Sequence, residues 1–483
     1  MDEQKPIRVR IAPSPTGYLH LGTARAALFN YLYAKKEKGT FIVRIEDTDV
    51  ERSLPIYEEG ILRGLKALNL TWDEGPDTGG PYGPYRQSER TDIYQKYIQK
   101  LVEQEKAYRC FCTKDEIEEE KKALLSQGIF PKYSGKCRSL SHDQIKEYED
   151  QNRSSVIRLK VPSNVSIEFQ DIIRGSISVN SDTIGDVVIA KNETSPLYNL
   201  AVVIDDHEMN ISHVIRGEDH ISNTPKQILI AHALGIEVPK YAHLPLVLSP
   251  DRSKMSKRKM ETSFDQYIAD GYLPEALVNF LALLGWHPEG DQEILSLDEL
   301  IKQFSLRRVQ KGGAVFNVDR LDWFNAQYIK SLPLEELIER IKKYIPQEWC
   351  SYQDTLTRAV EVERGRLTLL SQFKEAAAFF FTPIQYDARL LVWQSMSLSD
   401  VAANLIAIKS ELSQWDESAF VNAVEIENGL MPLAMERGRG ECLWPLRVAL
   451  SGLRNSPSPF EIMYVLGKTE TLARIDIALA QCS

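Results

Sequence analysis

The chain has 483 residues, of which 43% are hydrophobic and 26% charged, and its net charge is −10. This length predicts at least two domains of a globular protein, because one core rarely grows beyond about 250–300 residues. Six cysteines, a charged N-terminus and the lack of an apolar run of about 20 residues speak against a disulfide scaffold, a signal peptide and a membrane span, so we expect a cytoplasmic protein.

The N-terminal segment alternates strand-like and helix-like patterns. Residues 7–12 read as a short strand that runs into a Pro/Gly turn at 13–17. An apolar-periodic helix is expected from about Leu21 to Lys38, with Gly39 as its C-cap, followed by a second strand at 41–45. This order of strand, turn, helix and strand is typical of a parallel nucleotide-binding α/β sheet.

The middle and the end of the chain differ from this pattern. Residues 110 to about 190 combine a charged helical stretch, a cysteine cluster and short strands such as 156–161, which indicates an insertion into the sheet. Strands are again expected at 201–204 and 214–216. Beyond about 325, apolar residues from Leu334 to Ile345 repeat at helical spacing and prolines punctuate the rest, which predicts a separate helical domain.

The turn between the first strand and helix has the features of a phosphate site. A helix N-terminus offers free N–H groups and positive partial charge, Gly22 allows close approach, and His20 can donate to a phosphate oxygen. A second candidate is the basic loop from Lys254 to Arg258, whose lysines can neutralise the charge of a leaving pyrophosphate. Taken singly, the first motif could also be a strand–helix turn with a surface histidine, and the second could be a solvated basic loop.

Together the two motifs resemble the paired signatures of class I aminoacyl-tRNA synthetases. Residues 20–23 (HLGT) look like the first signature, with Thr23 in place of histidine, and residues 254–258 (KMSKR) like the second. The segments 10–17 (RIAPSPTG), 41–49 (FIVRIEDTD), 83–90 (GPYRQSER) and 214–219 (VIRGED) are similar to glutamyl-tRNA synthetases of the bacterial type.

This resemblance implies a set of site residues. The catalytic residues would be His20, Thr23, Lys254 and Lys257, with His20, Gly22 and Lys257 at ATP and Mg²⁺ sharing the phosphate charge. The glutamate pocket would consist of Arg10, Ala12, Ser14, Glu46, Tyr198 and Arg216. Arginine suits an anionic substrate because it offers a two-pronged, permanently charged donor to a carboxylate. The alternative for Arg10 and Arg216 is a structural ion pair, and Glu218 and Asp219 lie near Arg216 in sequence.

Three cysteines in the insertion form a candidate metal site. Cys110, Cys112 and Cys137 could hold zinc with one further ligand, or could be three free thiols. Their spacing resembles the zinc site of some bacterial glutamyl-tRNA synthetases, which implies Tyr133 as the fourth ligand. A histidine two residues after the last cysteine also belongs to that pattern, and here the residue is Ser139.

The C-terminal helical domain contains arginines of the kind that read splayed-out bases. Segments around Arg364, Arg366 and Arg447 resemble the anticodon-binding part of bacterial glutamyl-tRNA synthetases, and Arg366 falls where members that reject glutamine tRNA tend to carry arginine. For each of these arginines a solvated helix face is the alternative.

The resulting prediction is an α/β Rossmann-like catalytic domain with an α+β insertion, followed by an all-helical anticodon-binding domain. We divide the chain into a first catalytic half (1–109), an acceptor-stem-binding insertion (110–192), a second catalytic half (193–250), a stem-contact region with the basic loop (251–325) and the anticodon-binding domain (326–483). The resemblance implies a monomeric ligase that joins glutamate to tRNA(Glu) with ATP and Mg²⁺, and that needs tRNA for the activation step.

Other functions remain in competition with this one. A relaxed-specificity form would also charge tRNA(Gln), and a non-catalytic tRNA-binding paralogue should have lost signature residues that are present here. A glutaminyl-tRNA synthetase would have a β-rich anticodon module. A short paralogue or a small-molecule adenylyltransferase would not need the helical domain.

Overall fold

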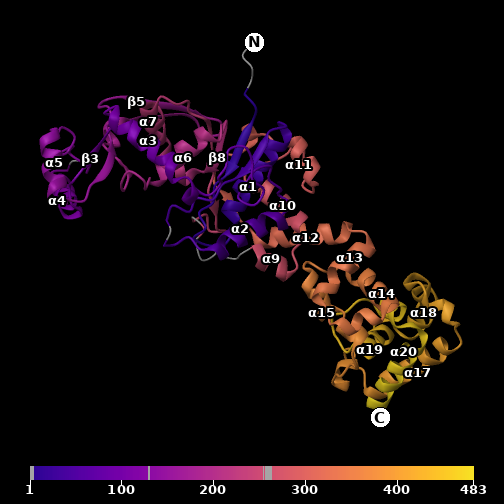
Figure 1. The fold of residues 1–483 in the computed structure, drawn as a ribbon. Helices are drawn as coiled ribbons and strands as arrows, with labels where there is room; N and C mark the ends of the chain where they lie inside the picture. Colours follow the sequence, from indigo (N-terminus) through magenta and orange to yellow (C-terminus); the bar gives the residue numbers. More distant parts are fainter. Residues whose placement is uncertain (1–4, 50, 129–130, 254, 256–263, 483) are drawn as a thin grey trace. The chain divides into compact units, whose positions relative to one another are not determined.

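The computed structural model describes residues 5–49, 51–128, 131–253, 255 and 264–482 (Figure 1). It divides into two compact units, the first made of residues 1–266 and 277–318 and the second of residues 267–276 and 319–483. The finer division into five segments stays a prediction. None of the described helices is both long and apolar enough to cross a membrane.

The first unit begins with the predicted strand–helix–strand. β1 (Arg8–Ile11) and β2 (Thr40–Val43) pair in parallel, and α1 (Leu21–Lys36), which connects them, packs on both. The expected C-cap at Gly39 is wrong: the helix ends at Lys36, Glu37 is the cap, and Lys38 has φ of 54°. Gly39 serves close packing instead, since a Cβ there would lie 2.3 Å from the carbonyl oxygen of Ile7.

A four-stranded sheet with the order β6-β5-β9-β8 continues the α/β part of the first unit. Its strands are β5 (Ser166–Asp171), β6 (Gly175–Asn180), β8 (His213–Gly217) and β9 (Lys240–Leu244). β8 and β9 pair in parallel, β8 also contacts β1, and the antiparallel hairpin β5–β6 joins β9 through Asp171 and Tyr241. Two strands from the predicted insertion therefore belong to the sheet that carries the second half of the core.

The strand predicted at 201–204 is wrong, because these residues lie inside α6 (Tyr198–Glu208). Every residue of α6 from Leu200 to Asp206 is buried, so the apolar run has no exposed face that would reveal helical periodicity. α6 packs against α7 (Thr224–Leu234) and α3 (Thr91–Glu103), and these helices share one hydrophobic core.

The rest of the first unit consists of a small antiparallel sheet and peripheral elements. The sheet has the order β3-β4-β7, with β3 (Ala107–Cys110), β4 (Val156–Leu159) and β7 (Val188–Ala190). The remaining elements are α2 (Pro55–Ala67), α4 (Lys114–Ser126), α5 (His142–Asp150), β10 (Val247–Leu248), α11 (Leu297–Gln303) and β11 (Ala314–Val315). Three helices each contain a boundary between the two units in sequence: α9 (Phe264–Asp270), α10 (Pro274–Leu283) and α12 (Val318–Ser331).

The second unit is helical, as predicted, and has its own core. Its helices are α13 (Leu334–Ile341), α14 (Gln353–Glu363), α15 (Phe373–Ala376), α16 (Ala378–Phe381), α17 (Leu398–Ser413), α18 (Ala423–Arg437), α19 (Arg439–Ser451) and α20 (Pro459–Gln481). α17 to α20 pack on one another. Two details differ from the sequence reading: α13 ends before Ile345, and Pro432 and Pro445 lie inside helices.

Candidate functional site

The N-terminus of α1 has the form of an anion site. β1 leads through the turn at 13–17 to His20, which caps the helix: its Nδ1 accepts from the backbone N–H of Thr23 at 3.3 Å, and its Nε2 lies 3.0 Å from Thr23 Oγ1. A Cβ at Gly22 would lie 3.3 Å from the His20 ring, so glycine leaves this ring room against the first turn. His20, Gly22 and the N-terminus of α1 thus lie together in one turn, and the role of His20 as the helix cap was not part of the sequence prediction.

The second predicted motif falls almost entirely outside the described residues. Lys254 and Lys257 belong to the undescribed positions 254 and 256–263, and Met255, which is described, is buried.

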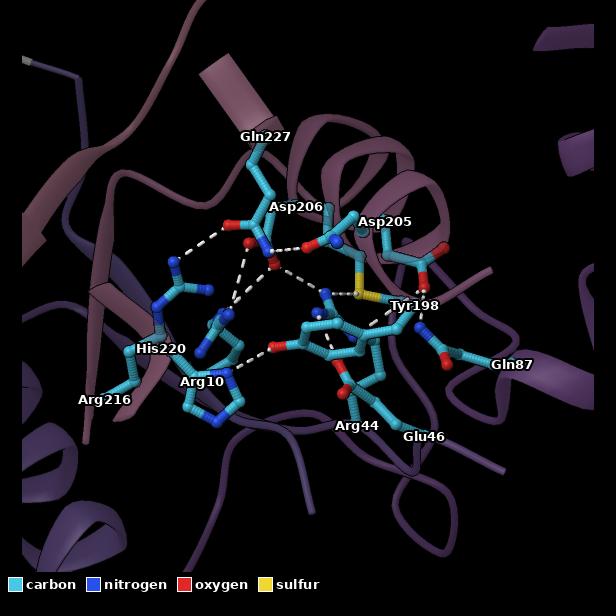
Figure 2. A network of polar contacts seen from close by, with 12 residues as sticks. Arg10, Arg44, Glu46, Gln87, Tyr198, Asp205, Asp206, Arg216, His220 and Gln227 are labelled. Carbon is cyan, nitrogen blue, oxygen red and sulfur yellow. Dashed lines mark hydrogen bonds and ion pairs between the residues drawn. The ribbon is translucent and has the colours of Figure 1, made fainter. Parts of the chain in front are cut away.

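A buried network of charged side chains fills the space between β1, β2 and α6 (Figure 2). Asp206 on α6 accepts two hydrogen bonds from Arg10, from Nε at 3.1 Å and Nη2 at 3.3 Å, and a third from Arg44 Nη1 at 2.7 Å. Arg44 also donates to Glu46 Oε1 at 3.1 Å. One carboxylate and one guanidinium thus link the two predicted pocket residues Arg10 and Glu46.

Burial and the arginines act in opposite directions on these carboxylates. Burial by itself would raise the pKa of Asp206, but the guanidinium groups of Arg10 and Arg44 outweigh it and hold the pKa below its ordinary value. For Glu46 burial wins over the same arginines, and its pKa is raised. Asp206 is therefore the fixed negative charge of the network.

A second carboxylate on α6, Asp205, connects Arg44 of this network to the segment from Gln87 to Tyr94. It accepts from Arg90 Nε at 2.7 Å, from Gln87 Nε2 at 2.8 Å and from the hydroxyl of Tyr94 at 2.9 Å, and it lies 3.8 Å from Arg44 Nε. The segment from Gln87 to Tyr94 is thereby tied to α6.

Arg216, at the end of β8, differs from the other buried arginines. Its side chain donates to three uncharged groups: Nε to His243 Nε2 at 3.2 Å, and Nη2 to Thr224 Oγ1 at 2.7 Å and Gln227 Oε1 at 2.9 Å. Its Nη1 is buried without a hydrogen-bond partner among the described residues.

The alternative prediction for Arg216, a structural ion pair with Glu218 or Asp219, is therefore not seen in the described part of the chain. Glu218 pairs with Arg174 instead. For Arg10 the ion-pair alternative does apply, since Asp206 is its partner. Burial lowers the pKa of Arg216. A buried cation without a carboxylate partner is costly in an empty site and is suited to receive an anionic ligand.

The remaining predicted pocket residues are Tyr198, Ala12 and Ser14. Tyr198, at the start of α6, is half-buried and its hydroxyl lies 3.0 Å from Nδ1 of His220. Burial raises the pKa of Tyr198 to about 12 and, with Arg216 nearby, lowers that of His220 to about 4, so both are neutral at pH 7. Ala12 is partly exposed and Ser14 is exposed.

The three cysteines and the tyrosine of the insertion come together as predicted. The three sulfur atoms lie within 4.8 Å of one another, and Cys112 Sγ is 3.5 Å from Cys137 Sγ. The Tyr133 hydroxyl is 3.3 Å from Cys110 Sγ and 3.4 Å from Cys112 Sγ. Ligands at the usual zinc distances on a tetrahedron are about 3.3–3.8 Å apart, so this donor set fits zinc. Burial raises the pKa of the Cys112 thiol to about 12.

The predicted anticodon arginines are in different surroundings. Arg364 donates to the carbonyl oxygens of Lys330 and Leu332, so it fixes the end of α12. Arg366 is exposed. Its Nε lies 3.2 Å from Oε2 of Glu363, and its Nη1 donates to the carbonyl oxygen of Ser456 at 3.2 Å. Arg447, on α19, is half-buried.

The network contains several residues that the sequence reading missed. They are Arg44, Asp171, Asp205, Asp206, Thr224, Gln227 and His243. A signal existed for the two aspartates, because two adjacent acids inside an otherwise apolar run are rarely buried without partners. His243 gave no comparable signal.

The chain matches known proteins over nearly its whole length. Residues 6–323 match the family model described as tRNA synthetases class I (E and Q), catalytic domain, and residues 336–479 match that of an anticodon binding domain. The chain is 44% identical to glutamate–tRNA ligase 2 of Caldanaerobacter subterraneus subsp. tengcongensis, over 98% of this chain and 99% of the relative. It is 46% identical to the glutamate–tRNA ligase of Carboxydothermus hydrogenoformans, over 97% and 99%.

A solved structure is similar to this chain over nearly its whole length. The crystal structure of a glutamate tRNA ligase from Elizabethkingia meningosepticum, in complex with its amino acid, superposes with a TM-score of 0.89 at 35% identity. The match covers 99% of this chain and all of that one.

Proposed function

Because the chain belongs to the glutamate–tRNA ligases, we propose that it activates glutamate with ATP and transfers it to tRNA(Glu), as a cytoplasmic monomer. An oxygen of glutamate's α-carboxylate attacks the α-phosphorus of ATP, the bond to the β-phosphate breaks, and pyrophosphate leaves. A ribose hydroxyl of the terminal adenosine of tRNA then attacks the carbonyl carbon of the mixed anhydride, forming the ester and releasing AMP and a proton. The protein positions and neutralises, and no side-chain nucleophile is required.

The amino-acid pocket is the part of this proposal that the geometry supports most directly. We assign it to Arg10, Ala12, Ser14, Glu46, Tyr198 and Arg216. The observation that carries the assignment is the buried Arg216, whose Nη1 has no partner in the described chain while its other donors are held in place. A carboxylate of glutamate would complete its hydrogen bonds, whereas the neutral amide of glutamine would leave the buried charge uncompensated. Glu46 would receive the α-ammonium group.

The phosphates of ATP are assigned to the N-terminus of α1 and to the basic loop. His20, Gly22 and Thr23 would line the α-phosphate side, and Lys254 and Lys257 would approach the leaving pyrophosphate. Mg²⁺, which class I tRNA synthetases use with ATP, would be held by the nucleotide's phosphates and share their negative charge.

Removing one of the loop lysines tests that assignment. Lys257→Ala is expected to slow adenylate formation by about 10²–10³-fold, because a preorganised cation acts on the charge that develops in the transition state. The KM for glutamate should change little. Single-turnover adenylate formation with tRNA present measures the rate, and Lys5→Ala, which removes an exposed lysine, is the control. An unchanged rate would remove Lys257 from the catalytic residues.

The insertion is assigned to the acceptor stem, with a structural zinc ion on Cys110, Cys112, Tyr133 and Cys137. Protein purified without chelators should contain about one zinc per chain, and Cys137→Ala should lose it, while Cys350→Ala, which changes a cysteine outside the cluster, should keep it. Elemental analysis measures the content. Less than about a tenth of an equivalent in the unaltered protein would exclude a zinc site, since structural zinc binds tightly.

Arg366 is assigned to the anticodon, together with Arg364 and Arg447 of the same unit. The exposed guanidinium of Arg366, fixed by Glu363 and Ser456, supports a role in discrimination. The test is ATP-dependent attachment of labelled glutamate to separate transcripts of tRNA(Glu) and tRNA(Gln) from the source organism. Charging of tRNA(Glu) alone supports this proposal, charging of both means the relaxed-specificity form, and charging of neither would point to a non-catalytic paralogue.

A further inference from the structure

We propose that Asp171 and His243 are positioning residues that hold Arg216 in the orientation in which it receives a carboxylate of the amino-acid substrate. The inference rests on the pocket role proposed for Arg216, and it adds two residues that lie behind that pocket. Neither residue is expected to touch the substrate.

A continuous chain of contacts supports this. His243 Nδ1 lies 2.7 Å from Asp171 Oδ2, and His243 Nε2 lies 3.2 Å from Arg216 Nε. An ionised carboxylate only accepts hydrogen bonds, so Nδ1 must carry the imidazole proton, and Nε2 is then an acceptor. It faces both the Arg216 Nε–H and the Thr224 hydroxyl, whose oxygen lies 3.1 Å away. Asp171 thereby selects the tautomer of His243 that can bind the arginine.

Their surroundings keep His243 and Asp171 each in one protonation state. His243 is fully buried and Asp171 is 3% exposed. Burial lowers the pKa of His243 despite the hydrogen bond to Asp171, so the imidazole is neutral at pH 7. The Asp171 carboxylate is stabilised by His243 and by the backbone N–H groups of Ile173 and Arg174 against the effect of burial, and its pKa is lowered.

The contacts of Arg216 show what the pair contributes. With Nε bound to His243 and Nη2 bound to Thr224 and Gln227, the plane of the guanidinium is fixed from two sides. The third nitrogen of the Arg216 guanidinium, Nη1, has no hydrogen-bond partner among the residues that the structure describes. A buried neutral imidazole is a useful acceptor here, because it orients the cation without cancelling its charge as a carboxylate would.

Three variants test the proposal on the full-length enzyme, with glutamate and ATP each varied at saturating tRNA. Asp171→Asn keeps the shape, and its Oδ1 can still accept from the backbone N–H groups of Ile173 and Arg174. Its amide nitrogen takes the place of Oδ2, which also accepts from the backbone N–H of His243, so this backbone hydrogen bond is lost. The amide donates to Nδ1 and moves the imidazole proton to Nε2, where it faces the Arg216 Nε–H. His243→Phe removes the acceptor. Both are expected to raise the KM for glutamate about 10- to 100-fold, since a hydrogen bond to a charged group is lost, with the KM for ATP within about twofold. His243→Gln, which can still present an acceptor, should recover most of the loss.

A double-variant comparison separates positioning from a general effect on folding. In an Arg216→Met background, His243→Phe should change the KM for glutamate by less than about twofold, because the residue it acts through is gone. A normal glutamate KM in His243→Phe, an equal rise in both KM values, or a full additional loss in the Arg216→Met background would overturn the inference. If Arg216→Met itself leaves the KM for glutamate unchanged, the proposed pocket fails, and the inference with it.

Discussion

Asp206→Asn is expected to lower the free energy of unfolding of the first unit by about 3–5 kcal/mol, the usual cost of breaking a buried ion pair by removing one partner. Asp206 is the carboxylate shared by Arg10 and Arg44, and all three side chains are less than a tenth exposed. Asparagine keeps the shape and can still accept from Arg10 Nε and Arg44 Nη1 through one oxygen, but its amide nitrogen in the place of Oδ2 would face Arg10 Nη2. The change therefore removes the negative charge and one acceptor beside two buried cations.

Urea denaturation of the full chain, with hydrogen exchange of α6 peptides, measures this effect in the unit that carries the change. Glu237→Gln is the control, because it breaks the exposed pair with Lys5, in which both side chains are 74% exposed, and it should cost less than about 1 kcal/mol. If Asp206→Asn is no more destabilising than this control, the buried network does not stabilise the fold.

Arg216→Met is expected to separate stability from activity. It should reduce kcat/KM for glutamate by about 10²–10³-fold, because it removes the buried cation that would pair with a substrate carboxylate. The same change should leave the thermal unfolding midpoint unchanged or raise it, since Arg216 contacts no carboxylate in the described structure and methionine spares the protein a buried charge.

Aminoacylation kinetics and calorimetry on the same preparations measure both quantities. Arg63→Met is the matched control: Arg63 pairs with Asp265 at the surface, and its loss should affect neither activity nor the midpoint strongly. Retained activity would remove Arg216 from the pocket. A lower midpoint would show that its contacts with His243, Thr224 and Gln227 stabilise the empty protein.

Features with a local cause could be predicted from the sequence. The opening strand and helix follow from a short apolar run, a Pro/Gly turn and an apolar segment of helix length, all within about 40 residues. The cluster of Cys110, Cys112 and Cys137 also follows from spacing, because all three lie within about 30 residues of the chain.

Features that depend on burial from several sides could not be predicted in this way. α6 was mistaken for a strand because it is covered on all sides and shows no amphipathic period. The partners of Arg216 come from β9 and α7, and the support of His243 comes from β5, more than 70 residues earlier in the chain. A buried histidine that binds an arginine and an aspartate has no local signature, since its tautomer depends on residues that only the fold brings together.

The hairpin β5–β6 has a consequence for exchanging modules between relatives. A graft cut at 110 and 192 would carry away β5 and β6, which belong to the sheet of β8 and β9, and with them the aspartate that faces His243. β3, β4 and β7, in contrast, form a sheet of their own. An exchange that spares the site would therefore be discontinuous, with residues from about 107 to 161 and from about 183 to 190 replaced and the hairpin kept from the host enzyme. The replaced strands would still have to fit the core that they share with α6 and α7.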